Sequence, residues 1–241
     1  DTGKIFNIDY NLLKALSAAV ECVHSYSLIH DDLPCMDDDD IRRGKLSTHK
    51  KFGESTAILS GNSLLTLAFE ILSDKKLKIK NKIKTELIYS LGICSGHSGM
   101  AGGQYLDLNF EHKKVNKLQL IEMQNKKTGK LFSFCCSSSA IIKEKKLSMK
   151  RDLSQIGLQI GLLYQISDDL IDVRGNSNKA GKPTKRDVKR GKATLVNLLG
   201  YNNLLEFAYS LKNKLVNKIK KYGTKSRDLL ESLEYIIHRE V

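Results

Sequence analysis

Two clusters of aspartates, far apart in the chain, hold the side chains best suited to bind metal ions. Residues 31–40 contain six aspartates and residues 168–172 contain three. Crowded carboxylates repel one another and are costly to desolvate, so a cation between them is expected. Hard oxygen ligands of this kind suit Mg²⁺. If the two clusters face each other, they would form a multi-metal clamp for a phosphate or diphosphate.

The second cluster has the spacing of one helix face. Asp168 and Asp172 are four residues apart, and Gln165 lies three residues before Asp168. These positions lie on nearly the same side of a helix. Gly161 is one further turn back and would leave room beside them. A helix cap explains one aspartate well, but it explains poorly three that follow the apolar residues 162–164.

The first cluster is followed at once by Arg42 and Arg43. A calcium loop is one alternative, but the glycine position of an EF-hand is absent. A solvated acidic surface is another. Adjacent arginines donate planar, bidentate hydrogen bonds to phosphate oxygens. Acids for a metal and arginines for an anion in one segment favour a metal–diphosphate site.

The composition is that of a globular protein with excess positive charge. The 241 residues are 41% hydrophobic and carry a net charge of +13. A chain of this length can bury a full core as one domain. Its lysines are spread along the sequence, without a nucleic-acid-binding motif, so we expect a solvated surface and no nucleic-acid partner. Part of the charge would attract an anionic substrate.

Cysteine usage and hydropathy indicate a cytoplasmic protein. The five cysteines are odd in number and include no CxxC pair, which is typical of reduced thiols. No signal-peptide pattern opens the sequence, and its uninterrupted apolar runs are too short to span a bilayer. We therefore expect no stable membrane insertion.

The elements that must position these residues are helices. Apolar residues recur at helical spacing, and no segment shows the alternation of a strand. Asp9 is a plausible N-cap for the first helix, which runs into Asp31 and is disturbed at Pro34. A single all-α domain follows. The expected helices cover residues 12–31, 55–72, 85–94, 117–142, 157–173, 203–221 and 225–239.

Five segments, in order, resemble motifs of the trans-isoprenyl diphosphate synthases. Residues 27–51 resemble the first aspartate-rich motif of that family and residues 168–172 the second. Residues 102–107 (Gly-Gly-Gln-Tyr-Leu-Asp) resemble the GGQxxD element, 127–129 (Lys-Thr-Gly) the KTG element, and 191–194 (Gly-Lys-Ala-Thr) the basic element after the second motif. The similarity extends over nearly the whole chain. It implies a helical bundle around a central cavity.

The resemblance also implies a role for each matched residue. It implies metal ligands at Asp31, Asp37, Asp168 and Asp172, with Asp32 and Asp38 in support. It implies diphosphate contacts from Arg42, Lys127, Lys182 and Lys192, and isopentenyl diphosphate contacts from Arg43 and His24. It places Gln104, Thr128 and Gln165 at the reacting centre, where Lys127, Thr128, Gln165 and Asp168 would be catalytic.

Simpler interpretations remain for several of these residues. His24 could be a satisfied core histidine, and His30 fits that description better. Gln104 could be a helix-packing amide. The lysine- and arginine-rich residues 179–192 could be a solvated loop, or a lid that closes on diphosphate and excludes water.

The activity implied by the resemblance is a head-to-tail condensation of an allylic diphosphate with isopentenyl diphosphate. It needs Mg²⁺, with three ions expected per site when substrate is bound, in a homodimer. Tyr26 and Ser27, just before Asp31, would form the floor of the chain pocket. Tyr26 lies roughly 7.5 Å down the helix from Asp31, so its bulk favours a farnesyl product.

Alternatives to this activity are a geranylgeranyl diphosphate synthase, a non-catalytic subunit of a heteromeric prenyl synthase, or a terpene cyclase. Asp168–Asp172 disfavours the cyclase, which usually carries an Asn/Ser/Glu triad there. Two intact aspartate motifs disfavour the non-catalytic subunit. The family's GGKRxRP element, which binds isopentenyl diphosphate, is not found in this sequence. We therefore expect residues 1–241 to form one synthase domain without the N-terminal helix that carries this element.

Overall fold

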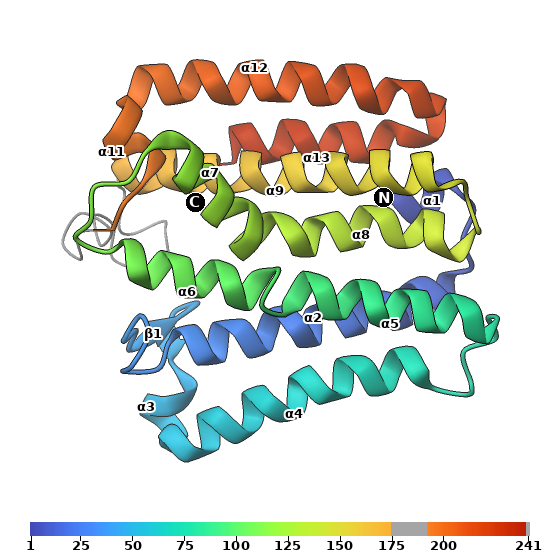
Figure 1. Cartoon of the computed structure of the whole chain (residues 1–241), viewed down its shortest axis with the longest axis horizontal. Helices are drawn as coiled ribbons and strands as arrows, with labels where there is room; N and C mark the ends of the chain where they lie inside the picture. Colours follow the sequence, from blue (N-terminus) through green and yellow to red (C-terminus); the bar gives the residue numbers. More distant parts are fainter. Residues whose placement is uncertain (175–191, 240–241) are drawn as a thin grey trace. The chain divides into compact units, whose positions relative to one another are not determined.

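The computed structural model describes residues 1–174 and 192–239, and within them it confirms the all-α fold (Figure 1). A two-stranded hairpin is the one β feature of the described residues. The elements, in chain order, are α1 (Thr2–Ile5), α2 (Tyr10–Asp31), β1 (Ile41–Arg42), β2 (Lys45–Leu46), α3 (Thr48–Phe52), α4 (Glu54–Ser73), α5 (Asn81–Ser95), α6 (Met100–Phe110), α7 (Lys117–Gln124), η1 (Asn125–Gly129), α8 (Lys130–Ile142), α9 (Leu147–Arg174), α11 (Leu195–Leu199), α12 (Tyr201–Ile219), η2 (Lys220–Ser226) and α13 (Arg227–His238).

Backbone contacts divide the described residues into two compact units. Residues 9–88 form the smaller unit, and residues 1–8, 89–174 and 192–239 form the larger one. The smaller unit carries the first aspartate cluster, and the larger unit carries the second. The expectation of one synthase domain stays a prediction.

In the smaller unit, α2 and α4 pack along each other. The side chain of Asp9 accepts hydrogen bonds from the backbone amides of Asn11 and Leu12, which confirms Asp9 as the N-cap. A Cβ atom on Gly61 of α4 would lie 2.1 Å from His30 Nε2, so only glycine admits this ring. His30 Nε2 also lies 3.1 Å from the carbonyl oxygen of Ile58. His30 thus packs against α4, but its side chain is only partly buried, so the expectation of a core histidine is met only in part.

The hairpin β1–β2 was not expected from the sequence. Ile41 pairs with Leu46 and Arg42 with Lys45. Arg43 and Gly44 form the turn with φ of 52° and 74°, a combination typical of two-residue hairpins. Strands of two residues are too short to show an alternating pattern, which is why the sequence did not reveal them.

In the larger unit, α9 lies between α8 on one side and α12 and α13 on the other (Figure 1). Leu163 and Ile166 of α9 are fully buried, as are Leu204 and Leu215 of α12. Helix α9 begins at Leu147, ten residues before the expected start. The aspartates at its far end are therefore carried by a long, well-packed helix.

The helix expected over residues 117–142 is interrupted by a π-helical turn. Helix α7 ends at Gln124, η1 takes up Asn125–Gly129, and α8 continues from Lys130. A π turn adds one residue to a helix, and ordinary helical spacing resumes on either side of it, so the periodicity within each segment does not reveal it. Such turns are frequent at functional sites, and this one contains Lys127 and Thr128.

Two glycines bring other helices onto this π turn. A Cβ on Gly103 of α6 would lie 2.1 Å from the backbone nitrogen of Lys127, and one on Gly161 of α9 would lie 2.6 Å from Gly129 Cα. The expectation that Gly161 leaves room beside the acids is therefore wrong, because the backbone of Gly129 fills that space.

Helices α2 and α4 are long and apolar enough, by length and composition, to cross a membrane. Core helices of soluble proteins pass the same test, and α2 carries Lys14 and Glu21 in its middle, so the finding is weak support for a membrane span.

Candidate active site

The chain after α2 folds back and brings two predicted metal ligands together. The backbone amide of Asp37 donates to the carbonyl oxygen of Asp31 at 2.8 Å, and that of Asp39 donates to Asp32 at 3.1 Å. Pro34 follows the end of the helix, as expected. Asp31 and Asp37, six residues apart in sequence, are thus neighbours at the C-terminal end of α2.

The buried Asp32 and the partly exposed Arg42 form an ion pair beside these ligands. Arg42 Nε donates to Asp32 Oδ1 at 3.0 Å, and Nη2 also donates to Oδ1. Asp32 is 2% exposed. Burial raises the pKa of this carboxyl, although Arg42 opposes the shift through its hydrogen bond and its charge. Asp32 therefore supports Arg42, and among the described residues no hydrogen bond occupies Arg42 Nη1.

His24 and Tyr26 lie on α2 before this cluster. Burial lowers the pKa of His24, and the charges of Arg43 and Arg42 lower it further against the opposing effect of Glu21. Ser27 donates from its hydroxyl to the carbonyl oxygen of His24 at 2.9 Å. His24 therefore lies close enough to Arg43 and Arg42 to feel both charges.

The three aspartates of the second cluster lie in different surroundings. Asp169 is 4% exposed and accepts hydrogen bonds from Gln165 Nε2 at 3.1 Å and Gln124 Nε2 at 3.3 Å. Thr128 donates from its hydroxyl to Gln165 Oε1 at 3.3 Å. Asp169 thus orients the two predicted reacting-centre residues Thr128 and Gln165. The sequence placed Asp169 in the second aspartate cluster without giving it a role of its own, and it did not point to Gln124.

Asp168 is more open and is held by a residue from the far end of the chain. Its side chain is 38% exposed and accepts a hydrogen bond from Arg239 Nη2 at 2.5 Å. Arg239 Nη2 also donates to the carbonyl oxygen of Tyr164 at 3.1 Å, and the guanidinium lies 3.8 Å from the centre of the Tyr164 ring. Asp172 is half-buried, one turn further along α9.

Two predicted diphosphate-binding lysines share one carboxylate. Lys127 Nζ donates to Asp107 Oδ2 at 2.6 Å and Lys192 Nζ donates to the same oxygen at 3.5 Å. Burial would raise the pKa of Asp107, but the charges and hydrogen bonds of the two lysines together lower it. Asp107 ends the GGQxxD element, so three of the matched motifs meet here. Lys182 lies outside the described residues.

Gln104 is buried, at 9% exposure, yet neither atom of its amide has a hydrogen-bond partner among the described residues. A buried amide without partners costs free energy. A helix-packing role alone does not account for this cost, which a polar ligand or water would relieve.

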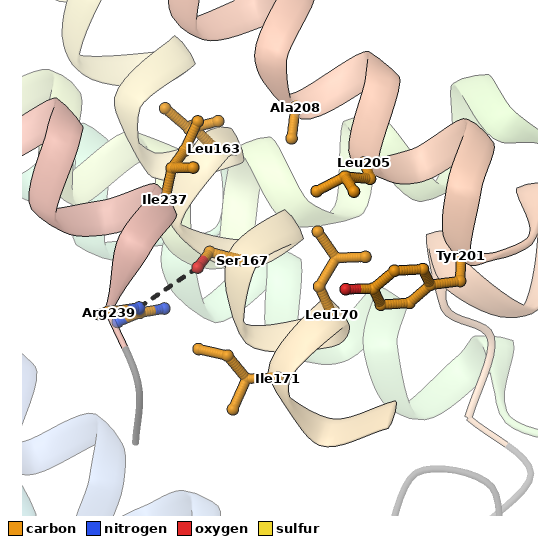
Figure 2. A pocket seen from close by; sticks show the side chains of 9 residues that line it. All are labelled: Leu163, Ser167, Leu170, Ile171, Tyr201, Leu205, Ala208, Ile237 and Arg239. Carbon is orange, nitrogen blue, oxygen red and sulfur yellow. Dashed lines mark hydrogen bonds between the residues drawn. The ribbon is translucent and has the colours of Figure 1, made fainter. Parts of the chain in front are cut away.

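A small pocket of about 40 Å³ lies between α9, α12 and the C-terminal end of α13 (Figure 2). Leucine, isoleucine and alanine side chains from α9, α12 and α13 make up most of its wall, and Ser167, Tyr201 and Arg239 are its polar members. Arg239 Nε donates to Ser167 Oγ at 3.4 Å. None of the predicted ligands lines this pocket.

An all-α chain with two aspartate motifs and the neighbouring lysines Lys127 and Lys192 has the features of an enzyme that binds diphosphates. The polyprenyl synthetase family model matches residues 2–236. The chain is 41% identical to the farnesyl diphosphate synthase of Escherichia coli over 243 aligned positions, which cover 99% of this chain and 81% of that protein. The chain belongs to the polyprenyl synthetase family.

Solved structures agree with this assignment. An FPP/GFPP synthase from Zymomonas mobilis superposes on this chain with a TM-score of 0.88 at 39% identity. The superposition covers 98% of this chain and 80% of that one. A geranyltransferase from Helicobacter pylori, complexed with magnesium and isoprenyl diphosphate, superposes with a TM-score of 0.84 at 33% identity, covering 98% and 81%.

Proposed function

We propose that this chain is a prenyltransferase that condenses dimethylallyl or geranyl diphosphate with isopentenyl diphosphate, giving farnesyl diphosphate and diphosphate. The observation that carries the proposal is the convergence of the GGQxxD, KTG and second aspartate motifs around Asp107 and Asp169. Cationic groups for a diphosphate and neutral dipoles for a carbocation are the two requirements of this reaction, and they occur side by side.

Magnesium is the metal that fits the donor set. Asp31 and Asp37 offer carboxylate oxygens in the smaller unit, and Asp168 and Asp172 do so in the larger one. Oxygen-only ligands of this kind suit Mg²⁺. Bound magnesium would neutralise the diphosphate as it leaves. Three ions per site when substrate is bound are our proposal.

The protein side chains would then divide the chemistry between them. Lys127 and Lys192 stabilise the charge that develops on the departing diphosphate. Gln165 Oε1 and Thr128 Oγ1 present dipoles to the allylic cation without offering a strong nucleophile. The double bond of isopentenyl diphosphate attacks that cation, and the departed diphosphate accepts the proton that is lost.

We further propose that His24 and Arg43 contact isopentenyl diphosphate, that Arg42 contacts the allylic diphosphate through Nη1, and that Lys182 adds to this contact. A homodimer in the cytoplasm is also part of the proposal. The runner-up is a geranylgeranyl diphosphate synthase, since the first aspartate motif alone fits either product.

Tyr26 is proposed to set the product length. Its ring is half-buried and lies 5.5 Å from the ring of His30, edge to face. With Ser27 beside it, the tyrosine would close the pocket below Asp31. Tyr26→Ala should lengthen the product beyond farnesyl diphosphate, whereas Tyr10→Ala, on an exposed position of the same helix, should not.

The test is product analysis with geranyl diphosphate, labelled isopentenyl diphosphate and Mg²⁺, with EDTA as control. Metal-dependent farnesyl diphosphate is the expected product. Longer products from the unaltered chain would contradict the role of Tyr26 but keep the reaction. If no product forms, and Mg²⁺ with geranyl diphosphate also fails to raise the melting temperature, the metal site itself is contradicted.

A further inference from the structure

A group of potential metal ligands lies in the smaller unit, apart from the four proposed magnesium ligands. It consists of Asp38, Asp40 and His49. One carboxylate oxygen of each aspartate and one ring nitrogen of His49 all lie within 4.8 Å of one another. Both aspartates are exposed, whereas His49 is only 6% exposed. A buried nitrogen base behind two exposed acids differs from the all-carboxylate clusters described above.

The hairpin β1–β2 brings these residues together. Its register continues beyond the strands, because the amide of Ser47 donates to the carbonyl oxygen of Asp40 at 2.8 Å. Helix α3 starts directly afterwards, so His49 comes back to the beginning of the hairpin. On the other side, the amide of Asp38 donates to the carbonyl oxygen of Leu33 at 3.0 Å.

The hydrogen bonding of His49 leaves one nitrogen unused. Nδ1 lies 3.1 Å from the hydroxyl of Ser47, itself a buried residue. Nε2 is buried and has no hydrogen-bond partner among the described residues. If the ring proton is on Nδ1 and is directed to Ser47 Oγ, Nε2 keeps a lone pair that can bind an ion. Metal-binding histidines are typically oriented in this way, by a hydrogen bond from the other nitrogen.

We propose that Asp38, Asp40 and His49 form a second divalent-cation site, which takes a transition ion such as Mn²⁺, Co²⁺ or Zn²⁺. An imidazole nitrogen with two carboxylates favours these ions over Mg²⁺. Donors about 2.0–2.2 Å from one ion lie at most about 4.4 Å apart, so small side-chain rotations would close the group around it. A bound ion would tie the start of α3 to the hairpin that carries Arg42 and Arg43.

Lys50 is the internal competitor of this ion. Its Nζ lies 3.0 Å from Asp40 Oδ1, and both side chains are well exposed. An exposed ion pair is weak, so a divalent ion could displace the ammonium group. Removing Lys50 should therefore tighten ion binding, whereas removing a ligand should weaken it.

The experiment is pulsed electron paramagnetic resonance of Mn²⁺ bound to the full chain without diphosphate. A directly bound imidazole gives strong ¹⁴N modulation, whereas carboxylate ligands give none of their own, so the signal separates this site from the magnesium ligands. We expect the modulation in the unaltered chain and its loss in His49→Gln. Ser47→Ala should keep the modulation but weaken the affinity about tenfold. Lys50→Met should raise the affinity about two- to fivefold.

Matched variants keep the result decisive. His97→Gln, an exposed histidine of the larger unit, should leave the nitrogen modulation unchanged. If His49→Gln does not fold, Asp40→Asn must weaken the affinity at least tenfold instead. Absence of nitrogen modulation in the unaltered chain, its survival in folded His49→Gln, or unchanged affinity in Asp40→Asn would overturn the proposal. None of these measurements depends on prenyl transfer, so the two proposals fail separately.

Discussion

Arg239 Nη2 donates to Asp168 Oδ1 at 2.5 Å, so the chain after α13 supplies a counter-ion to the second aspartate cluster. The guanidinium is almost buried, while Asp168 is partly open. A cation in this position neutralises Asp168 in the metal-free protein. It must also compete with any metal ion that Asp168 binds.

Arg239→Gln is therefore expected to destabilise the metal-free chain and to enlarge its response to metal. We expect a loss of about 1 kcal/mol, or roughly 2–4 °C in melting temperature for a chain of this size. Mg²⁺ with diphosphate should restore most of it. Thermal unfolding with and without Mg²⁺ measures both effects. Arg227→Gln, which removes an exposed pair with Glu231, is the control; an equal Mg²⁺ response in all three proteins would argue against competition at Asp168.

Asp107 is expected to position the two lysines rather than to bind substrate. Asp107→Asn removes the shared negative charge, so the ammonium groups of Lys127 and Lys192 repel each other and lose their fixed places. Misplaced groups slow chemistry, so kcat should fall about tenfold or more. The KM for geranyl diphosphate should fall or stay unchanged, because the site becomes more positive.

Steady-state kinetics separate these effects. Glu122→Gln, which removes the surface pair with Lys126, should change neither constant. A rise in KM at constant kcat would contradict the positioning role.

The lowered pKa of Asp107 also makes stability depend on pH. The ion pairs of Asp107 contribute their full stability above the ordinary carboxyl pKa of 3.8, and they lose it as the pH falls through the lower pKa of the folded protein. In Asp107→Asn the unfolding free energy should therefore fall less steeply below about pH 4 than in the unaltered chain.

His24 is expected to be neutral at pH 7 in the free protein. Its pKa lies below the ordinary 6.5, first because of burial. A lowered histidine pKa contributes full stability above 6.5, and this contribution declines as pH falls from 6.5 through the folded value. The imidazole NMR signal of His24 should therefore titrate with a midpoint below 6.5.

Two variants test the causes of the shift in His24. Glu21→Gln removes the charge that opposes it, so the midpoint should fall further, and Arg43→Met should raise it. Isopentenyl diphosphate should raise the midpoint if His24 contacts the anion. A midpoint that does not respond to either substitution would show that His24 is screened from both charges.

The sequence predicted the long helices and the matched motifs, but not the contacts that organise them. Apolar spacing identifies α2, α4 and α12 because each buries one face over several turns. The hydrogen bonds from Gln124 to Asp169 and from Arg239 to Asp168 join residues 45 and 71 positions apart. Such pairs leave no local pattern. The π turn at Asn125–Gly129 likewise preserves the helical spacing on both sides of it.

The glycine contacts around the π turn give the last prediction. Gly161→Ala would place a Cβ 2.6 Å from Gly129 Cα. Alanine favours a helix over glycine by about 1 kcal/mol, but overpacking against a backbone costs about 1–3 kcal/mol. Because the contacted atom is backbone, we expect the overpacking cost to lie at the upper end of this range, with a net loss of up to about 2 kcal/mol in unfolding free energy.

Denaturant unfolding measures this loss, with Ser148→Ala on an exposed position of α9 as the control that should change stability by less than about 0.5 kcal/mol. The same displacement should reach Lys127 and Thr128, since Gly129 directly follows them in η1. Gly161→Ala should therefore lower kcat as well as stability. A stabilised variant with unchanged kcat would mean that α9 and the π turn can separate without consequence, and that the close packing at Gly161 does not position the site.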